Sequence, residues 1–571
     1  MLKNSIYYIL GIAFLIASDL VEISIPKMIG RIVDILKHGT VSINLSEMSS
    51  KLWIFVFLSF LLLILRFFRR KYFIGVVLKL EYAVRNHLFS KFLRLPQAFY
   101  DRARTGDLMA RATNDVSAVR KMAGRAVLIS VDAIFLILVV LAVMIKAVGI
   151  KLTLMGVSPF PGILIISTVM GRKIRGRFRN VQEGFSRLSE SVQESFSGIA
   201  VVKGYAQEEG EIEKFEKLSM DYATRNLSLI KIWGALHPLV RLLAGTGTVL
   251  TILFGGKMVM EGKLTLGTLI AQTAYLGMLV FPMTAFGWII GLIEMGLASL
   301  KRLDEIMRKE ELEYGEESGM KIHGNVEFEM VSFKYPGSKK LVLKNVSFNV
   351  KKGEILGITG RVGSGKSTIA KLLVRMYETE CGKILVDGED LRKIPRRDLL
   401  KHVALVPQET FLFSTTVKDN IAFGKEDVSL EEIKKVAKLA GIHDTIISLP
   451  KGYETVVGER GVKLSGGEKQ RIALARALMM DPKILILDDA LSAVDLKTEE
   501  MILNNLKGFM RERTTIIISH RIRSVREADH ILVLEDGKIV EEGTHEELMN
   551  LKGLYYEMGV QQSLEEGLRV I

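Results

Sequence analysis

Residues Gly353–Met376 read GEILGITGRVGSGKSTIAKLLVRM. GEILGIT is typical of a buried strand, GRVGSGKST is a glycine-rich turn, and IAKLLVRM has helical apolar spacing. In such a turn, backbone N–H groups can surround phosphate oxygens, and the helix N-terminus adds partial positive charge. Here Lys366 is expected to reach phosphate groups, and Ser367 is expected to ligate Mg²⁺. The predicted phosphate-binding residues are Gly360, Arg361, Gly363, Ser364, Gly365, Lys366, Ser367 and Thr368.

A second buried strand, KILILDD (Lys483–Asp489), ends in two carboxylates. Its Asp488 is a candidate Mg²⁺ ligand, although an Asp at this position can also cap the next turn. Between the two strands, LSGGEKQRIALARAL (Leu464–Leu478) places small residues and a hydroxyl before a strong helix pattern. Taken alone, Ser465 is either a second anion contact or a simple N-cap.

The C-terminal part alternates strand and helix patterns. NVEFEMVSFKY and VLKNVSFNV alternate apolar and polar residues as strands do, and later strands are separated by helices. This order predicts an α/β domain with a largely parallel sheet. The charged stretch KEELEYGEESGMKIHG after Arg308 predicts a linker. The expected division is therefore 1–307, a linker at 308–323, and 324–571.

The N-terminal part holds apolar segments of membrane-spanning length. A bilayer core of about 30 Å needs about 20 apolar residues in a helix. We therefore predict an α-helical membrane domain of six transmembrane helices fused to the α/β domain. The six segments are Tyr7–Ile29, Leu52–Phe68, Val127–Ala147, Leu152–Met170, Leu236–Met258 and Leu266–Leu292.

Basic residues set the expected orientation. They cluster after the second segment (RFFRRKYF) and after the fourth (GRKIRGRFR), and are few in the short loop Lys146–Lys151 after the third. Both basic connections and both chain ends are therefore expected in the cytoplasm of a cell-membrane protein. The basic connections keep helical spacing, which predicts helical hairpins with long cytoplasmic extensions. Their expected turns are Thr105–Asp115 and Ser197–Gln207.

Composition and charge bear on the possible partners of the chain and on disulfide bonds. The 571 residues are 49% apolar and 25% charged, with a net charge of +14. A basic chain suits an anionic membrane face or nucleic acid. The sequence carries no RNA- or DNA-binding signature, which argues against nucleic acid. A single cysteine, Cys381, rules out an internal disulfide.

LSGGE resembles the LSGGQ signature of ABC ATPases, and nearly the whole chain resembles an ABC exporter half-transporter. The resemblance implies that Tyr335 stacks on adenine, that Gln408 lies near Mg²⁺, and that His520 contacts the γ-phosphate. It assigns a D-loop to Ser492–Asp495. The signature residues that would face the partner chain's ATP are Leu464, Ser465, Gly466, Gly467 and Glu468.

The resemblance also implies how ATP drives transport. Each ATP would lie between one chain's phosphate-binding loop and the other chain's signature, so that the transporter is a dimer in the bilayer. Closure and release of the ATPase domains would alternate access to the two sides. The implied coupling segments are Asp107–Asn114 and Gly198–Tyr205, with Glu459 and Arg460 in contact with such segments.

One departure from the family pattern bears on catalysis. Asp489 stands where the family has a catalytic Glu that orients the attacking water. A carboxylate one methylene shorter sits roughly 1–1.5 Å short of its usual reach, and a misplacement of about 1 Å can cost ~10²-fold in rate. The chain is therefore expected to hydrolyse ATP slowly at its own site, as one subunit of heterodimeric bacterial multidrug exporters does. The alternative is a homodimer that tolerates Asp489.

Charged residues at membrane depth are the candidate substrate contacts. We single out Asp132, Arg241 and Glu294; the alternatives are that they lie near the membrane surface or pair with each other. The expected substrates are hydrophobic or amphipathic compounds. The alternatives are a lipid or peptide exporter of the same fold and a soluble ABC ATPase, and the apolar segments disfavour the last.

Overall fold

The computed structural model describes residues 2–38, 45–458 and 461–568. The chain forms two compact units. The helical unit comprises Met1–Leu93 and Arg104–Lys309, and the α/β unit comprises Arg94–Ala103 and Glu310–Ile571. Residues 310–325, which lead into the first strand, contain neither helix nor strand.

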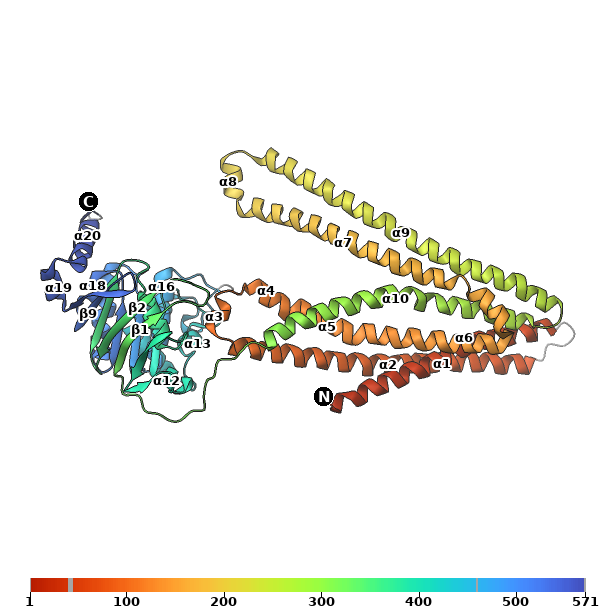
Figure 1. Ribbon diagram of the computed structural model, residues 1–571, viewed down its shortest axis with the longest axis horizontal. Coiled ribbons are helices and arrows are strands. Elements are labelled where there is room, and N and C mark those ends of the chain that lie inside the picture. The colour runs from red at the N-terminus through yellow and green to blue at the C-terminus, as the bar shows by residue number, and fades with distance from the viewer. Residues whose placement is uncertain (1, 39–44, 459–460, 569–571) are drawn as a thin grey trace. The chain divides into compact units, whose positions relative to one another are not determined.

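The helical unit is built from long helices joined by short turns. Figure 1 shows α7 and α9 running side by side and joined by the short α8. The run from α4 to α6 is continuous helix with two π-helical turns. The elements are α1 (Leu2–His38), α2 (Leu45–Arg94), α4 (Thr105–Ala110), η1 (Arg111–Asp115), α5 (Val116–Lys121), η2 (Met122–Ala126), α6 (Val127–Val157), α7 (Phe160–Ser197), α8 (Ile199–Gly204), α9 (Glu208–Met260) and α10 (Leu266–Met307).

Among the described residues, five helical segments are long and apolar enough to cross a membrane. They contain five of the six predicted spans, so the count of six is not confirmed by length and composition. The segments are Ile6–Leu36, Met48–Arg94, Thr105–Val157, Glu208–Met260 and Leu266–Met307.

The predicted fourth span, Leu152–Met170, is wrong as a single helix. α6 ends at Val157 and α7 begins at Phe160, so the segment is divided between two helices. Pro159 lies at this break, where its ring and its missing N–H oppose continuation of α6. The predicted loop Lys146–Lys151 contains a second interruption, because Gly149 leaves helical geometry with φ 79°.

One predicted hairpin turn is confirmed, and the other is misplaced. The turn at Ser197–Gln207 is present, since α7 ends at Ser197 and α9 begins at Glu208. Thr105–Asp115, in contrast, is helical. The first turn comes earlier because Pro96 disfavours helical geometry in the residue before it, and α2 accordingly ends at Arg94.

The α/β unit alternates strands and helices, and the two predicted early strands are present as β1 and β2. Its elements are α3 (Gln97–Tyr100), β1 (Val326–Phe333), β2 (Leu343–Val350), β3 (Ile355–Gly360), α11 (Lys366–Leu373), β4 (Cys381–Val386), β5 (Glu389–Asp390), α12 (Arg396–His402), β6 (Val403–Val406), α13 (Val417–Ile421), α14 (Leu430–Leu439), α15 (His443–Ser448), η3 (Gly452–Glu454), α16 (Gly466–Met479), β7 (Ile484–Asp488), α17 (Leu496–Arg511), β8 (Thr514–Ile518), α18 (Ile522–Val525), β9 (His530–Glu535), β10 (Lys538–Gly543), α19 (His545–Leu551) and α20 (Leu554–Leu568).

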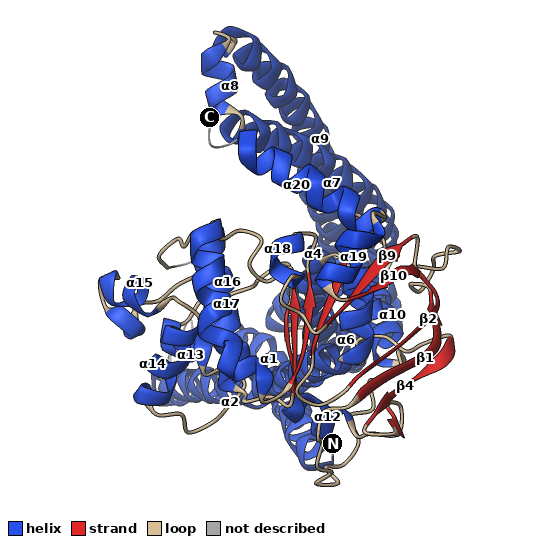
Figure 2. Ribbon diagram, turned by 90° about the vertical axis from the view of Figure 1, so that its left-hand side faces the viewer, coloured by secondary structure: helices blue, strands red, loops and turns tan. Residues whose placement is uncertain are grey.

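The larger sheet has the order β10-β9-β3-β8-β7-β6, and all its pairs are parallel except β10 with β9. Both faces are buried: Ile484 and Ile486 of β7 pack in one core, and Leu485 and Leu487 pack in the other. Helices α13 to α17 gather on one side of the strands (Figure 2). Burial on both faces explains the continuous apolar runs of these strands and confirms the predicted parallel sheet. A separate antiparallel sheet has the order β2-β1-β4-β5.

Candidate functional site

The loop between β3 and α11 is shaped by its glycines. Gly360 has φ 139°, and a Cβ there would lie 2.1 Å from the carbonyl oxygen of Leu534. Gly365 has φ 104° and begins the turn into α11. Only glycine adopts such backbone without strain. The buried Lys366 ammonium donates hydrogen bonds to the carbonyl oxygens of Gly360 (2.8 Å) and Arg361 (2.9 Å), so a cation is held inside the loop.

Two groups in this loop suit a bound anion. The Ser364 hydroxyl is buried and finds no hydrogen-bond partner among the described residues. Burial lowers the pKa of Lys366 below its usual range, although Asp489 and Asp488 act in the opposite direction. A bound phosphate would reverse this shift and would accept from the Ser364 hydroxyl. The geometry therefore fits an anion cradle.

The end of β7 lies beside the start of α11. Ser367 Oγ donates to Asp488 Oδ1 at 2.8 Å. Burial raises the pKa of Asp488, and a bound divalent cation would reverse that shift. A hydroxyl and a carboxylate are oxygen ligands of the kind that Mg²⁺ prefers, so this pair fits the metal that was predicted here.

The next residue, Asp489, faces the loop after β8. Its Oδ1 lies 2.9 Å from His520 Nδ1 and accepts from the His520 backbone N–H at 3.3 Å. Asp489 is buried and has a left-handed backbone, with φ 45°. The structure thus places Lys366, Ser367, Asp488, Asp489 and His520 at the carboxyl ends of β3, β7 and β8, the usual ligand edge of a parallel sheet.

Two tyrosine rings, those of Tyr335 and Tyr377, form a pair beside α11. The Tyr335 hydroxyl lies 3.1 Å from Thr368 Oγ1, and Lys371 Nζ lies 5.6 Å from the Tyr335 ring centre. Tyr377 packs edge-on against Tyr335, with ring centres 5.1 Å apart. The Tyr377 hydroxyl donates to Asp101 at 2.6 Å, and burial followed by this bond raises the pKa of Tyr377. The sequence singled out Tyr335 and Thr368 and carried no signal for Tyr377 or Asp101.

The signature segment begins α16 with a capping box. Ser465 is the N-cap and accepts from the backbone N–H of Glu468, whose carboxylate accepts from the Ser465 N–H at 2.7 Å. The Ser465 hydroxyl therefore caps α16, and a capping hydroxyl at a helix N-terminus can also face an anion. Glu468, the departure from LSGGQ, keeps the acceptor that closes the box.

Gln470 connects α16 with the loop after β7. Its Nε2 donates to Ser492 Oγ at 3.0 Å, and its Oε1 accepts from the Ala493 N–H at 2.9 Å. The side chain is 4% exposed. The signature helix and the D-loop segment are therefore joined by one buried amide. The sequence offered no signal for this residue beyond its place two positions after Glu468.

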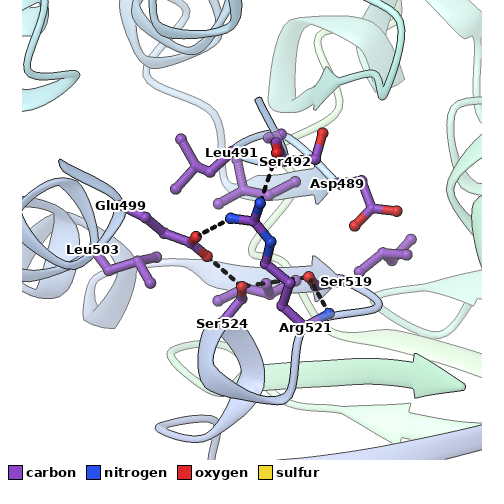
Figure 3. A pocket seen from close by; sticks show the side chains of 12 residues that line it. Asp489, Leu491, Ser492, Glu499, Leu503, Ser519, Arg521 and Ser524 are labelled. Carbon is purple, nitrogen blue, oxygen red and sulfur yellow. Dashed lines mark hydrogen bonds and ion pairs between the residues drawn. The ribbon is translucent and has the colours of Figure 1, made fainter. Parts of the chain in front are cut away.

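Arg521, which follows His520, makes a second connection to the same loop. Its guanidinium donates to Glu499 at 2.5 Å and to the Ser492 carbonyl oxygen at 2.8 Å. Figure 3 shows it between these two residues, with Ser524 on the other oxygen of Glu499. Glu499 is 2% exposed, and the Arg521 guanidinium pairs its buried charge.

Comparisons with known proteins agree with this geometry. The family model "ABC transporter transmembrane region" matches residues 8–283, and the model "ABC transporter" matches residues 343–492. The probable multidrug resistance ABC transporter ATP-binding/permease protein YheI of Bacillus subtilis is 38% identical over 565 residues, covering 98% of this chain and 96% of that protein. This chain belongs to the ABC transporter family.

Two further similar proteins indicate which kind of ABC transporter this chain is. The multidrug resistance-like ATP-binding protein MdlA of Escherichia coli is 36% identical, with 98% of this chain and 95% of that protein covered. A bacterial Atm1-family ABC exporter with ATP bound has a TM-score of 0.79 at 27% identity, with 98% of each chain covered. The chain is thus a multi-pass ABC exporter that fuses a membrane region to an ATPase. It binds ATP and couples its hydrolysis to transport.

Some predicted residues of the transporter are not joined to the phosphate loop. Gln408 lies exposed in the loop after β6. Asp495 caps α17 by accepting from the Thr498 N–H at 3.0 Å. Among the described residues, no hydrogen bond or ion pair connects Leu464–Glu468 with the phosphate loop. Glu459 and Arg460 lie outside the described residues.

The predicted coupling residues of the transporter lie at the helix junctions of the helical unit. Asp107, in α4, accepts from Arg111 at 2.9 Å. Asn114 lies exposed in the π-helical turn η1. Gly198 separates α7 from α8, and Tyr205 follows α8 with 76% of its surface exposed.

Two of the three predicted substrate residues are ion-paired. Asp132 accepts from Arg69 at 3.3 Å, and Arg69 also lies 3.8 Å from the buried Asp19. Glu294 lies 4.0 Å from Arg175, and Arg241 is exposed on α9. Asp132 and Glu294 therefore pair with Arg69 and Arg175, which the sequence did not single out, and not with one another.

Proposed function

We propose that this ABC exporter moves hydrophobic or amphipathic compounds out across the cell membrane by alternating access. The observation that carries the proposal is that one chain combines membrane-length helices with a phosphate loop whose Lys366 and Ser367 lie beside Asp488. Two relatives carry multidrug resistance in their names. Basic residues beside the spans support a cytoplasmic ATPase region and cytoplasmic chain ends. The proposed domains are 1–307 and 324–571, joined by the linker 308–323.

The proposed nucleotide site has a division of labour. Glycine-loop N–H groups and Lys366 bind phosphates, Tyr335 stacks on adenine, and His520 contacts the γ-phosphate. Ser367, Asp488 and Gln408 would hold Mg²⁺, which when bound offsets the negative charge of the phosphates. Ser465 and its neighbours in the signature would complete the partner chain's site, in which case each ATP needs both subunits.

The state of Asp489 supports a slow site in this chain. The carboxylate is buried and one of its oxygens is occupied by two His520 donors. The Asp489 side chain, one methylene shorter than Glu, ends at His520. A Glu side chain would be long enough to extend farther from the strand. We propose that the chain works as a heterodimer, in which its signature completes a faster site opposite a partner's catalytic Glu.

Exposed apolar residues support a coupling role for α8. Ile199 (47% exposed) and Val201 (63%) lie in this short helix, and Tyr205 (76%) follows it. We propose that α8, and the segment Asp107–Asn114, transmit closure of the ATPase regions to the membrane helices. Asp132, Arg241 and Glu294 remain the proposed substrate contacts, with the first and last available once their ion pairs open.

ATP-driven uptake of a fluorescent lipophilic cation into proteoliposomes, with the ATPase region facing outward, tests export. Uptake is expected with ATP and is expected to be lost in Lys366→Ala. Removal of a charged hydrogen-bonding group costs about 1.5–3 kcal/mol, or roughly 10–100-fold in nucleotide affinity. Lys352→Ala removes an equal charge from an exposed site and serves as control. Undiminished affinity in Lys366→Ala would contradict the assignment of the site.

The subunit proposal has its own test. ATP turnover is measured for this chain alone, for Asp489→Glu alone, and for the chain with a half-transporter that carries the catalytic Glu. We expect slow turnover alone, an increase of up to ~10²-fold in Asp489→Glu, and fast turnover in the mixed complex. High turnover of the unmodified chain, unchanged by the substitution, would establish a homodimer instead.

A further inference from the structure

The loop that carries His520 is held from outside the nucleotide site by α20. Gln562 Nε2 donates to the His520 carbonyl oxygen at 2.6 Å, and Gln562 Oε1 accepts from the Ile522 N–H at 2.9 Å. The N–H and C=O groups of the Gln562 amide thus both form hydrogen bonds, one with the backbone before Arg521 and one with the backbone after it. A primary amide is a side chain that can donate and accept at once in this way.

α20 is itself fixed to the α/β unit. Tyr555 is fully buried, and its hydroxyl lies 2.8 Å from His545 Nδ1. The Glu541 carboxylate accepts from the backbone N–H groups of Leu554 (2.5 Å) and Tyr555 (3.0 Å), where the helix begins. Gln562 therefore reaches the loop from an anchored helix, about two turns beyond Tyr555.

The backbone around His520 needs such support. Residues 519–521 form neither helix nor strand, so side-chain bonds and single backbone bonds determine their position. Arg521 ties the loop to Glu499 and to the Ser492 carbonyl oxygen on one side. Gln562 supplies hydrogen bonds from the other side, to His520 itself and to Ile522. The His520 ring is the group that contacts Asp489.

We propose that Gln562 is a positioning residue for His520, so that α20 influences ATP hydrolysis without touching the nucleotide. This inference rests on the proposed contact of His520 with the γ-phosphate. The amide fixes the His520 carbonyl group and the Ile522 N–H, and thereby sets the direction in which the His520 ring leaves the loop. Nucleotide affinity, which depends mainly on the phosphate loop, is little affected.

The test compares Gln562→Met with Ser563→Ala in the full-length chain without a partner subunit, so that the turnover measured comes from a site that contains His520. Methionine keeps the length and helix preference of glutamine and removes both hydrogen bonds. Ser563 is exposed, and its hydroxyl bonds only within α20, to the Gly559 carbonyl oxygen at 2.9 Å. We expect kcat to fall about tenfold in Gln562→Met, with KM for ATP within twofold, and no change in Ser563→Ala.

Two further readouts separate positioning from general support. Hydrogen exchange of the peptide containing Ile522 should speed up in Gln562→Met and not in Ser563→Ala. In a His520→Ala background, Gln562→Met should lower kcat no further, because both changes act on the same ring. An unchanged kcat in Gln562→Met, or full additivity with His520→Ala, overturns the inference. If His520→Ala alone leaves turnover unchanged, the proposed role of His520 is wrong, and so is this inference. Faster hydrogen exchange at Ile522 in Gln562→Met would then show only that the hydrogen bond exists.

Discussion

His520 and Asp489 meet at a single carboxylate oxygen. Asp489 Oδ1 lies 2.9 Å from His520 Nδ1 and 3.3 Å from the His520 backbone nitrogen. The contact joins the ends of β7 and β8, and Asp489 itself has a left-handed backbone, with φ 45°. The carboxylate proposed to orient water is thus also the group that holds His520.

This double use predicts different effects for two substitutions. Asp489→Ala removes the acceptor and should free the His520 ring, so that preference for ATP over ADP falls about tenfold. Asp489→Asn keeps an oxygen for His520 and should preserve that preference, while turnover falls in both variants. Equilibrium binding of ATP and ADP to each variant gives the ratio. Equal loss of preference in Asn and Ala variants would show that the contact does not position His520.

Gln470 should stabilise the α/β unit through its buried amide. Gln470→Ala leaves the Ala493 N–H without its acceptor, at a cost of about 1–3 kcal/mol. For a domain of this size, each kcal/mol lowers the melting temperature by roughly 2–4 °C. Thermal unfolding of the purified chain measures the shift. Lys469→Ala, one residue away on the same helix, is the control, and an equal shift in both would refute the role of the amide.

The strand, turn and helix around the phosphate loop were predictable because the pattern is local. Gly360 to Thr368 are contiguous, and their spacing alone requires a strand, a turn and a helix. Asp488 was found because a strand that ends in a carboxylate is recognisable by itself. The helical hairpin was harder: Thr105–Gly106 suggested a break, but Pro96 ends the preceding helix, since proline restricts the residue before it.

Contacts between distant residues could not be predicted in the same way. Gln470 meets Ser492, and Gln562 meets His520, only because the folded sheet brings their elements together. Polar residues on helices are normally solvated, so neither glutamine stood out in the sequence. The division of the fourth apolar segment at Pro159 was missed because hydropathy does not register where a helix breaks.

Tyr377 should act on the nucleotide site through its ring more than through its hydroxyl. Its edge-on contact with Tyr335 is the type of aromatic pair worth about 0.5–1.5 kcal/mol. Tyr377→Phe keeps this contact and loses the bond to Asp101, so ATP affinity should change by less than threefold. Tyr377→Ala removes the support of Tyr335 and should weaken ATP binding by up to about tenfold. Identical affinities for the Phe and Ala variants would contradict ring support.

The anchor of α20 should weaken in mild acid. Burial, and next the charge of Arg526, lower the pKa of His545 below its usual range. The unfolded chain, with a His pKa of about 6.5, then binds a proton more readily than the folded chain. The stability contributed by neutral His545 is therefore present above pH 6.5 and is lost as the pH falls from there toward the lower folded value.

His545→Asn isolates this titration. The Asn Oδ1 can stand in for Nδ1 as the acceptor for the Tyr555 hydroxyl, and it carries no proton in this pH range. Thermal unfolding at pH 7.5 and pH 5.5 should show a smaller loss of melting temperature in His545→Asn than in the unmodified chain. Burial also lowers the pKa of His402, which contributes equally to both proteins and cancels in the comparison. Because Tyr555 anchors the helix that carries Gln562, hydrogen exchange at Ile522 should show the same difference between the two proteins. An equal loss of melting temperature in both would mean that His545 stays neutral, or stays equally protonated, in the folded and unfolded chain.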